Sequence, residues 1–311
     1  MIVIAGGSGR LGTLLARRFV SHGVPVRLLT RSKARVASDL VLAVEVVEAD
    51  VTDERTLEPA LRGASVVVSA ISGFGGRDAL GARAVDDRGT AALVRAAEAA
   101  GAERFVLVSV LGASPTSRIG LFRAKAAAET ALRQSRLVPT IIRPTAYAET
   151  WLELVGGPVA ETGRTRVFGR GRNPVNFVSA DDVAAIVEHV VTDDGWAGAE
   201  LDVAGPENLT LDEVAGIAAT ALGRDVRIDH TPLAAMRVMA TATSRVRPAL
   251  SDQVRAAILM DTADMRANAS ARLAAFPDVP LTTVREVAAL MFARATAVLP
   301  LEAGAGRRAT P

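Results

Sequence analysis

The sequence predicts an α/β fold: a doubly wound parallel sheet followed by a smaller, mainly helical lobe. Two observations lead to this prediction. Strand-length apolar runs alternate with helical patterns through the first two thirds of the 311 residues, which is typical of parallel strands joined by helical crossovers. Beyond about residue 206, helical patterns surround a single short strand pattern, which indicates a separate lobe.

The predicted strands share near-continuous apolar residues, as expected for strands covered on both faces. They span 2–5, 25–30, 44–49, 65–70, 104–109, 138–143 and 199–204. Helical patterns lie between them at 11–22, 54–62, 82–100, 119–134 and 181–192. Right-handed crossovers place such helices on both faces of the sheet. Ser179 is a candidate cap for the helix at 181–192, because a serine hydroxyl accepts from free N–H groups there.

The predicted lobe combines an insert in the sheet domain with the last third of the chain. Its helical patterns lie at 210–222, 232–243, 250–260 and 282–297, with a short strand at 226–229. We therefore expect a sheet domain formed by 1–144 and 173–205, a lobe formed by 145–172 and 206–299, and a disordered tail at 300–311. The arginine-rich loop 163–174 reads as a solvated hairpin, with an anionic substrate as the alternative.

Composition excludes several classes of protein. The net charge is only +2, without the basic clusters of nucleic-acid or membrane-surface proteins. Cysteine is absent, so no disulfide or thiolate metal site exists, and no pair of the three histidines has metal-ligand spacing. Met1 leads directly into an apolar strand without a positive segment, so we expect no signal peptide and a cytoplasmic location. We also expect a monomer or homodimer.

The turn after the first strand, GGSGRLG, predicts a dinucleotide site in a Rossmann fold. Its glycines satisfy both G-x-G-x-x-G and G-x-x-G-x-x-G. Glycine is required because the turn is tight and the backbone must approach the pyrophosphate. The following helix offers free N–H groups and its positive dipole end to the phosphates. The predicted contacts are Gly6, Gly7, Ser8, Gly9, Arg10, Leu11 and Gly12.

The end of the second strand favours NADP(H) over NAD(H). An acidic residue about 20 positions beyond the glycines would bind the ribose hydroxyls of NAD, yet no Asp or Glu occurs between Gly12 and Asp39. Arg31 and Lys33 stand there instead, with Arg10 inside the glycine turn. Guanidinium and hydroxyl groups hydrogen-bond a 2′-phosphate that a carboxylate would repel.

Two further segments are predicted to contact the cofactor. Asp50 and Val51 follow the third strand, where a side chain can reach the adenine, whereas Asp53 reads as a helix cap. The loop 69–76 follows the fourth strand and is small enough to run beside the cofactor, although an ordinary loop remains the alternative. Its predicted contacts are Ala70, Ile71 and Ser72.

At this point the chain resembles the short-chain dehydrogenase/reductase superfamily, in its extended and atypical branch. Within it, the sequence is similar to NmrA-like and isoflavone-reductase or quinone-reductase-like proteins, which implies NADPH binding. The resemblance covers about residues 1–205. Its motifs are GGSGRLG, ADVTD, VDDRGTAALVRAAEAAG (85–101), FVLVSVLGA (105–113), LFRAK, IIRPTAY (141–147) and NFVSADDVA (176–184).

The resemblance implies a Ser, a Tyr and a Lys as catalytic residues. Ser109 and Lys125 match the first and the last, but Leu121 stands at the tyrosine position. The usual tyrosine exchanges the substrate proton with its pKa lowered by the lysine, and leucine cannot. Tyr147, the only tyrosine, follows the sixth strand, where it could contact substrate or supply a proton; a core or rim position is the alternative.

Lys125 is unusual because only two of the 36 basic residues are lysines, the other being Lys33. We expect Lys125 to lie under the nicotinamide ribose and to bind its hydroxyls or polarise a substrate carbonyl, because a compact ammonium fits a tight ribose site where a planar guanidinium does not. The alternative is a surface lysine preceding Glu129 by one turn.

The sequence is compatible with three functions. The first is an NADPH-dependent reductase that delivers hydride to a quinone, enone or similar small apolar carbonyl compound. The second is a redox-sensing NADP(H)-binding regulator without turnover, which the missing tyrosine favours. The third, nucleotide-sugar epimerisation, is disfavoured by Leu121. Neither nucleic acid nor membrane is an expected partner.

Overall fold

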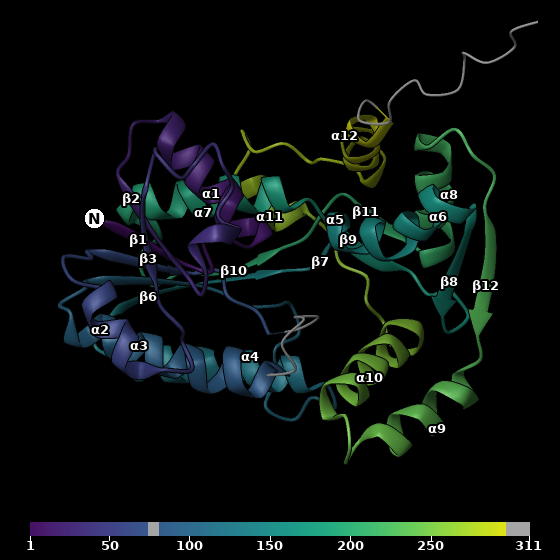
Figure 1. The fold of residues 1–311 in the computed structure, drawn as a ribbon, viewed down its shortest axis with the longest axis horizontal. Coiled ribbons are helices and arrows are strands. Elements are labelled where there is room, and N and C mark those ends of the chain that lie inside the picture. Colours follow the sequence, from purple (N-terminus) through teal and green to yellow (C-terminus); the bar gives the residue numbers. More distant parts are fainter. Residues whose placement is uncertain (74–80, 297–311) are drawn as a thin grey trace, which may run out of the picture.

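The computed structural model describes residues 1–73 and 81–296. A seven-stranded parallel sheet runs through the larger part (Figure 1), in the order β10-β6-β5-β4-β1-β2-β3. All pairings within it are parallel. The strands are β1 (Ile2–Ala5), β2 (Val26–Thr30), β3 (Glu45–Glu48), β4 (Val66–Ser69), β5 (Arg104–Val108), β6 (Val138–Pro144) and β10 (Glu200–Val203).

Helices cover both faces of this sheet (Figure 1). The helices α1 (Arg10–Ser21), α7 (Ala180–Thr192) and α11 (Ser270–Ala275) lie over one face. Over the other lie η2 (Glu54–Thr56), α2 (Leu57–Ala60), the π-helical η3 (Arg83–Gly89), α3 (Thr90–Ala99) and α4 (Gly120–Arg133). Each face has its own apolar core. The predicted doubly wound Rossmann architecture is therefore confirmed.

The apolar runs explain why this sheet forms. The strands β1, β4 and β5 are buried almost throughout, because side chains on both of their faces meet a helical layer. The polar ends of the helices are fixed locally: Ser179 caps α7 by accepting from Asp181 N–H. Each of the seven predicted strands is present, with ends that agree to within about two residues.

The remaining elements form the lobe beyond the carboxyl ends of the strands (Figure 1). A three-stranded sheet, β11-β9-β7, connects it to the main sheet, and β8 pairs with β12. Buried side chains from α5, η4, β8, α8, α10 and α12 form its core. The elements of the lobe are β7 (Ala146–Tyr147), α5 (Ala148–Trp151), η4 (Leu152–Gly156), α6 (Gly157–Thr162), β8 (Arg164–Phe168), β9 (Val175–Val178), β11 (Glu207–Leu209), α8 (Leu211–Ala221), β12 (Arg227–Thr231), α9 (Leu233–Thr243), α10 (Pro248–Thr262) and α12 (Val284–Thr296). Two short helical turns, η1 (Lys33–Arg35) and η5 (Asp194–Trp196), lie outside the lobe.

The expected hairpin at 163–174 is wrong. The strand β8 pairs in parallel with β12, which lies more than 60 residues further along the chain. Arg164 pairs with Asp229, and Arg170 with Asp261. Two of the four arginines of this segment, Arg164 and Arg170, thus connect it to other elements of the lobe. The predicted disordered tail at 300–311 lies outside the described residues.

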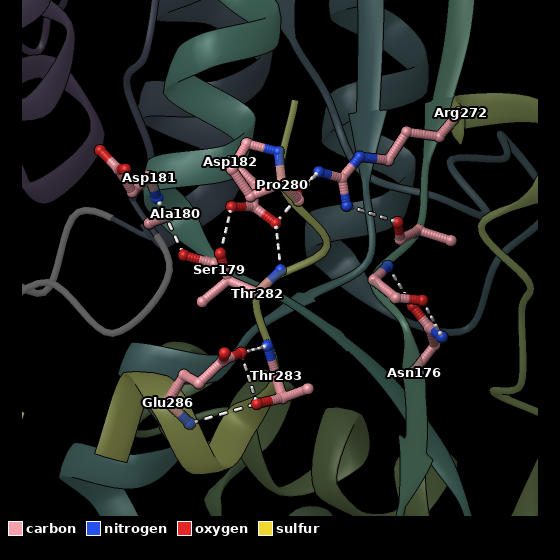
Figure 2. A network of polar contacts seen from close by, with 12 residues as sticks. Asn176, Ser179, Ala180, Asp181, Asp182, Arg272, Pro280, Thr282, Thr283 and Glu286 are labelled. Carbon is pink, nitrogen blue, oxygen red and sulfur yellow. Dashed lines mark hydrogen bonds and ion pairs between the residues drawn. The ribbon is translucent and has the colours of Figure 1, made fainter. Parts of the chain in front are cut away.

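A buried ion pair fastens the end of the chain to the sheet domain. The carboxylate of Asp182 on α7 accepts from the Arg272 guanidinium at 3.0 Å and from the hydroxyl and N–H of Thr282. Figure 2 shows Asp182 between these two partners. Both charged side chains are about 2% exposed. Phe276, which directly follows α11, stacks on Trp196 at a centroid distance of 4.6 Å.

Candidate functional site

A groove crosses the carboxyl ends of β1, β2 and β4, where the strand order reverses. Ligands of open α/β sheets bind at such a reversal. The groove is formed by the glycine turn, the ends of β2 and β3, and the loop after β4. Its lining residues are Ala5, Gly6, Ser8, Gly9, Leu29, Thr30, Arg31, Arg35, Ala49, Asp50, Val51, Leu57, Ala70, Ile71, Ser72, Gly73, Gly81 and Val85.

The glycine turn has the geometry of a phosphate cradle. Gly6 has φ +85°, a conformation that L side chains rarely adopt. A Cβ at Gly7 would lie 2.7 Å from Leu28 Cβ, and one at Gly12 would collide with the Gly6 carbonyl oxygen. The turn therefore requires these glycines, and it opens directly into α1, whose first turn carries no acidic residue.

The far end of the groove is basic. Ser8 Oγ and Thr30 Oγ1 lie 2.8 Å apart, at the point where β2 ends. Arg31 and Arg35 both line the groove there. The nearby Glu48 carboxylate accepts from Lys33 N–H at 2.8 Å and is not among the lining residues. Hydroxyl and guanidinium groups at this position suit a 2′-phosphate.

Asp50 and Val51 line the groove as the sequence predicts. The carboxylate of Asp50 also organises its own turn, because Oδ1 accepts from Thr52 N–H and from Thr52 Oγ1. Asp53 accepts from Arg55 N–H and caps η2, which confirms its predicted role.

Lys125 is buried inside the protein, away from the lining of the groove. Its Nζ lies 3.0 Å from Asp86 Oδ1, and donates to the carbonyl oxygens of Ile71 and Val108, each at 3.0 Å. Two backbone carbonyls thus accept hydrogen bonds from the ammonium, and the Asp86 carboxylate balances its charge as an ion pair. Asp86 in turn accepts from Gly73 N–H at 2.8 Å through its other oxygen.

The Lys125–Asp86 pair consequently holds the loop after β4 at two points. Lys125 binds the carbonyl of Ile71, and Asp86 binds the N–H of Gly73. Both loop residues line the groove. The arrangement makes Lys125 a positioning residue for the wall of the groove.

Ser109 belongs to a second buried network. Its hydroxyl donates to Glu129 Oε1 at 2.6 Å, and Glu129 also accepts from Arg143 and Arg133. Burial acts to raise the pKa of Glu129, but the hydrogen bonds from Arg143, Ser109 and Arg133 outweigh it, so this pKa lies below its usual value of 4.5. The Ser109 hydroxyl is thus directed to the carboxylate of α4.

Tyr147 lies on β7 and packs against the core over α1 and α7. Its hydroxyl is buried and has no hydrogen-bond partner among the described residues. Burial raises the pKa of Tyr147 above its usual value, with a further contribution from Glu149. A phenol in this state is a poor source of a proton at neutral pH.

Arg10, Leu11 and Lys33 do not line the groove. Arg10 pairs with Glu153 of η4 in the lobe, and Leu11 is buried in the core. Arg35 and Gly73 are among the further residues that line the groove, and Asp86 binds its wall from outside the lining. The sequence signal for Arg35 was its position four residues after Arg31, because the short helical turn η1 reverses the chain there and brings both arginines to the groove.

In the described ranges, no group of three or more His, Asp or Glu side chains could hold a metal ion. Among the helices that the structure describes, none is long and apolar enough to span a membrane.

Comparison with known proteins identifies the large domain. A family model described as NAD(P)H-binding matches residues 6–194. The chain is 28% identical over 243 residues to photosystem II assembly factor Ycf39 of Synechocystis, covering 78% of this chain and 74% of that protein. It is 30% identical over 238 residues to (4-alkanoyl-5-oxo-2,5-dihydrofuran-3-yl)methyl phosphate reductase of Streptomyces griseus, covering 76% and 79%.

Among solved structures, the NADPH complex of an NADPH-dependent quinone oxidoreductase from Escherichia coli is similar. The two share 25% sequence identity and a TM-score of 0.72, over 94% of this chain and 100% of that chain. The similarity therefore extends through the lobe as well as the sheet domain.

Proposed function

This chain belongs to the NAD(P)H-binding family, and from that premise we propose that it is an NADPH-dependent reductase. Its acceptor is a quinone, enone or similar small carbonyl compound. The observation that carries the proposal is the groove over the glycine turn, with Arg31 and Arg35 at its far end. Relatives named as reductases, including the Streptomyces griseus enzyme, support the same reaction class.

The chain's own residues bind and orient the cofactor. N–H groups at the start of α1 hold the pyrophosphate, and Arg31 and Arg35 hold the 2′-phosphate. The cofactor, when bound, supplies hydride. Lys125 and Asp86 fix the loop that borders it, so that the wall of the groove is preorganised before the cofactor arrives.

The acceptor class follows from the proton chemistry. Leu121 cannot donate a proton, Ser109 is directed to Glu129, and the Tyr147 hydroxyl is buried with a raised pKa. Quinones and enones accept hydride to give stabilised anions, which water can protonate. Simple ketones give alkoxides, which need a positioned acid in the transition state.

The first test is cofactor choice. In the Arg31→Ala/Arg35→Ala double variant, we expect the Kd of NADPH to rise by about tenfold or more, since a charge-assisted hydrogen bond contributes roughly 1.5–3 kcal/mol. The Kd of NADH should stay within about twofold, measured by fluorescence titration. Lys33→Ala is the matched control, because it removes a charge nearby without touching the groove. Equal losses for both cofactors would contradict the proposal.

The second test is NADPH oxidation with quinones, enones and saturated ketones. We expect turnover with the first two classes and little with saturated ketones. NADPH binding without turnover on any acceptor would instead support a binding protein without catalysis. The enclosed Lys125 ammonium and the resemblance to an assembly factor favour this second candidate.

A further inference from the structure

A second cavity lies between the beginning of α4 and the helix pair α9–α10, which are neighbours in Figure 1. Its volume is about 530 Å³. It shares no lining residue with the groove over the glycine turn. Its lining residues are Arg118, Ile119, Arg123, Arg237, Arg255, Ile258, Leu259 and Thr262.

Four arginines, Arg118, Arg123, Arg237 and Arg255, are among the lining residues of this cavity. In the part of the chain that the structure describes, none of the four forms an ion pair. Arg123 donates to the Ser117 carbonyl oxygen. The carboxylate of Asp252, which adjoins Gly120, is not part of the lining. Arg170, on the same lobe, is by contrast paired with Asp261.

The uncompensated charge indicates what the cavity can bind. The four arginines are exposed, so they place uncompensated positive charge at the solvent-facing side of the cavity, and like charges there repel each other. A bound anion relieves this repulsion. Guanidinium groups also match the bidentate geometry of carboxylates and phosphates better than ammonium groups do.

Apolar side chains occupy the rest of the wall. Ile119 is about 2% exposed, and Ile258 and Leu259 are half-buried. A mainly apolar cavity with a few convergent polar groups is the usual form of a small-molecule site. The wall therefore favours a ligand with an apolar body over a bare inorganic ion.

We propose that this cavity binds a small organic anion, with its carboxylate or phosphate among the arginines and its apolar body against Ile119, Ile258 and Leu259. The site stands apart from the cofactor groove, so its occupancy is measured by binding without any turnover. Failure of the proposed reductase reaction would leave this binding unaffected.

The test uses three probes with one chain length: octyl phosphate, octanoate and octan-1-ol, titrated as monomers by calorimetry. We expect the two anions to bind at least about tenfold more tightly than the alcohol, as charge-assisted hydrogen bonds allow. Saturation with NADPH should leave the anion affinities unchanged.

Variants locate the site. Arg118→Gln/Arg255→Gln should weaken binding of octyl phosphate by about tenfold or more and leave octan-1-ol unchanged. Arg245→Gln is the matched control, because it removes one charge from the same lobe outside the cavity, and we expect a change below about twofold. Arg237→Gln, a second variant in the lining, should also weaken binding of octyl phosphate. The Tm of every variant is measured by thermal melting, so that a loss of binding is distinguished from a loss of folding.

Three results would overturn the proposal. Octan-1-ol could bind as tightly as octanoate, which would mean that the arginines do not contribute to binding of the anionic group. Arg245→Gln could weaken the anions as much as the double variant, so that only overall charge matters. NADPH could displace octyl phosphate competitively, so that the anion occupies the cofactor groove.

Discussion

The ammonium of Lys125 occupies a space bounded by the Asp86 carboxylate and two backbone carbonyls. A planar guanidinium, with five donors in a fixed fork, does not match a carboxylate and two carbonyl oxygens placed around one point. This explains why an arginine-rich chain retains lysine here. The sequence predicts that Lys125 holds the nicotinamide ribose, and this stays a prediction. The ion pair with Asp86 could not be predicted, because nothing in the local sequence shows that Asp86 faces Lys125.

Lys125→Met should lower the free energy of unfolding by about 3–5 kcal/mol, since it leaves the buried Asp86 charge uncompensated. It should also raise the Kd of NADPH by loosening the loop at Ile71. Chemical denaturation and NADPH titration measure the two effects. Lys33→Met, the only other lysine change available, should alter stability by less than about 0.5 kcal/mol.

The double variant Lys125→Met/Asp86→Leu tests whether Lys125 and Asp86 stabilise the protein as a pair. Removing both partners should cost clearly less than the sum of the single substitutions, because no buried charge remains. Additive losses would contradict the assigned role of the pair.

Two buried glutamates should make opposite contributions to the pH dependence of stability. Burial raises the pKa of Glu149 above its usual 4.5, so the folded state binds this proton more tightly. The stability from Glu149 is therefore complete below pH 4.5 and is lost as pH rises through the folded pKa. The pKa of Glu129 is lowered, so its stability is present above pH 4.5 and is lost as pH falls through the folded pKa.

Urea unfolding of Glu149→Gln and Glu129→Gln between about pH 4 and pH 7 tests these signs. The wild-type advantage over Glu149→Gln should shrink with rising pH, and that over Glu129→Gln should grow. Difference curves that run parallel in pH would contradict both assignments.

At the scale of elements, the sequence predicted the parallel sheet well because its strands are buried on both faces and read as continuous apolar runs. The strand β8 was misjudged because its segment alternates, with Thr165 and Val167 buried between exposed neighbours. Such alternation is common to hairpins and isolated strand pairs. The partner strand β12 is remote, and local patterns carry no information about remote pairing.

The start of α1 provides a prediction about glycine. Gly12→Ala should abolish tight NADPH binding and lower the Tm, because the new Cβ would collide with the Gly6 carbonyl oxygen. Gly216→Ala is the matched control inside α8, where a Cβ meets nothing within 4 Å. It should stabilise the protein by roughly 0.5–1 kcal/mol through helix propensity. Thermal melts and NADPH titration of both variants decide the point, and equal losses would contradict it.

At the scale of the whole molecule, the ion pair between Asp182 and Arg272 joins the last part of the chain to the sheet domain. Arg272→Met should lower the free energy of unfolding by about 3–5 kcal/mol, because Asp182 is then buried without its cation. Arg266→Met is the control, since its pair with Asp264 is exposed and should contribute at most about 1 kcal/mol. A similar loss in both variants, measured by denaturation, would contradict this ranking.

The same ion pair has a consequence for biosynthesis. Asp182 and Arg272 are separated by 90 positions in the chain. At roughly 5–20 residues per second, a ribosome needs about 5 to 18 seconds to make the arginine after the aspartate. During that interval the amino-terminal end of α7 lacks its cation and the sheet lacks the cover of Phe276. The nascent sheet domain therefore cannot complete its packing until the segment around Arg272 and Phe276 has been made. A ribosome stalled before residue 272 would leave Asp182 without its cation and this face of the sheet partly uncovered.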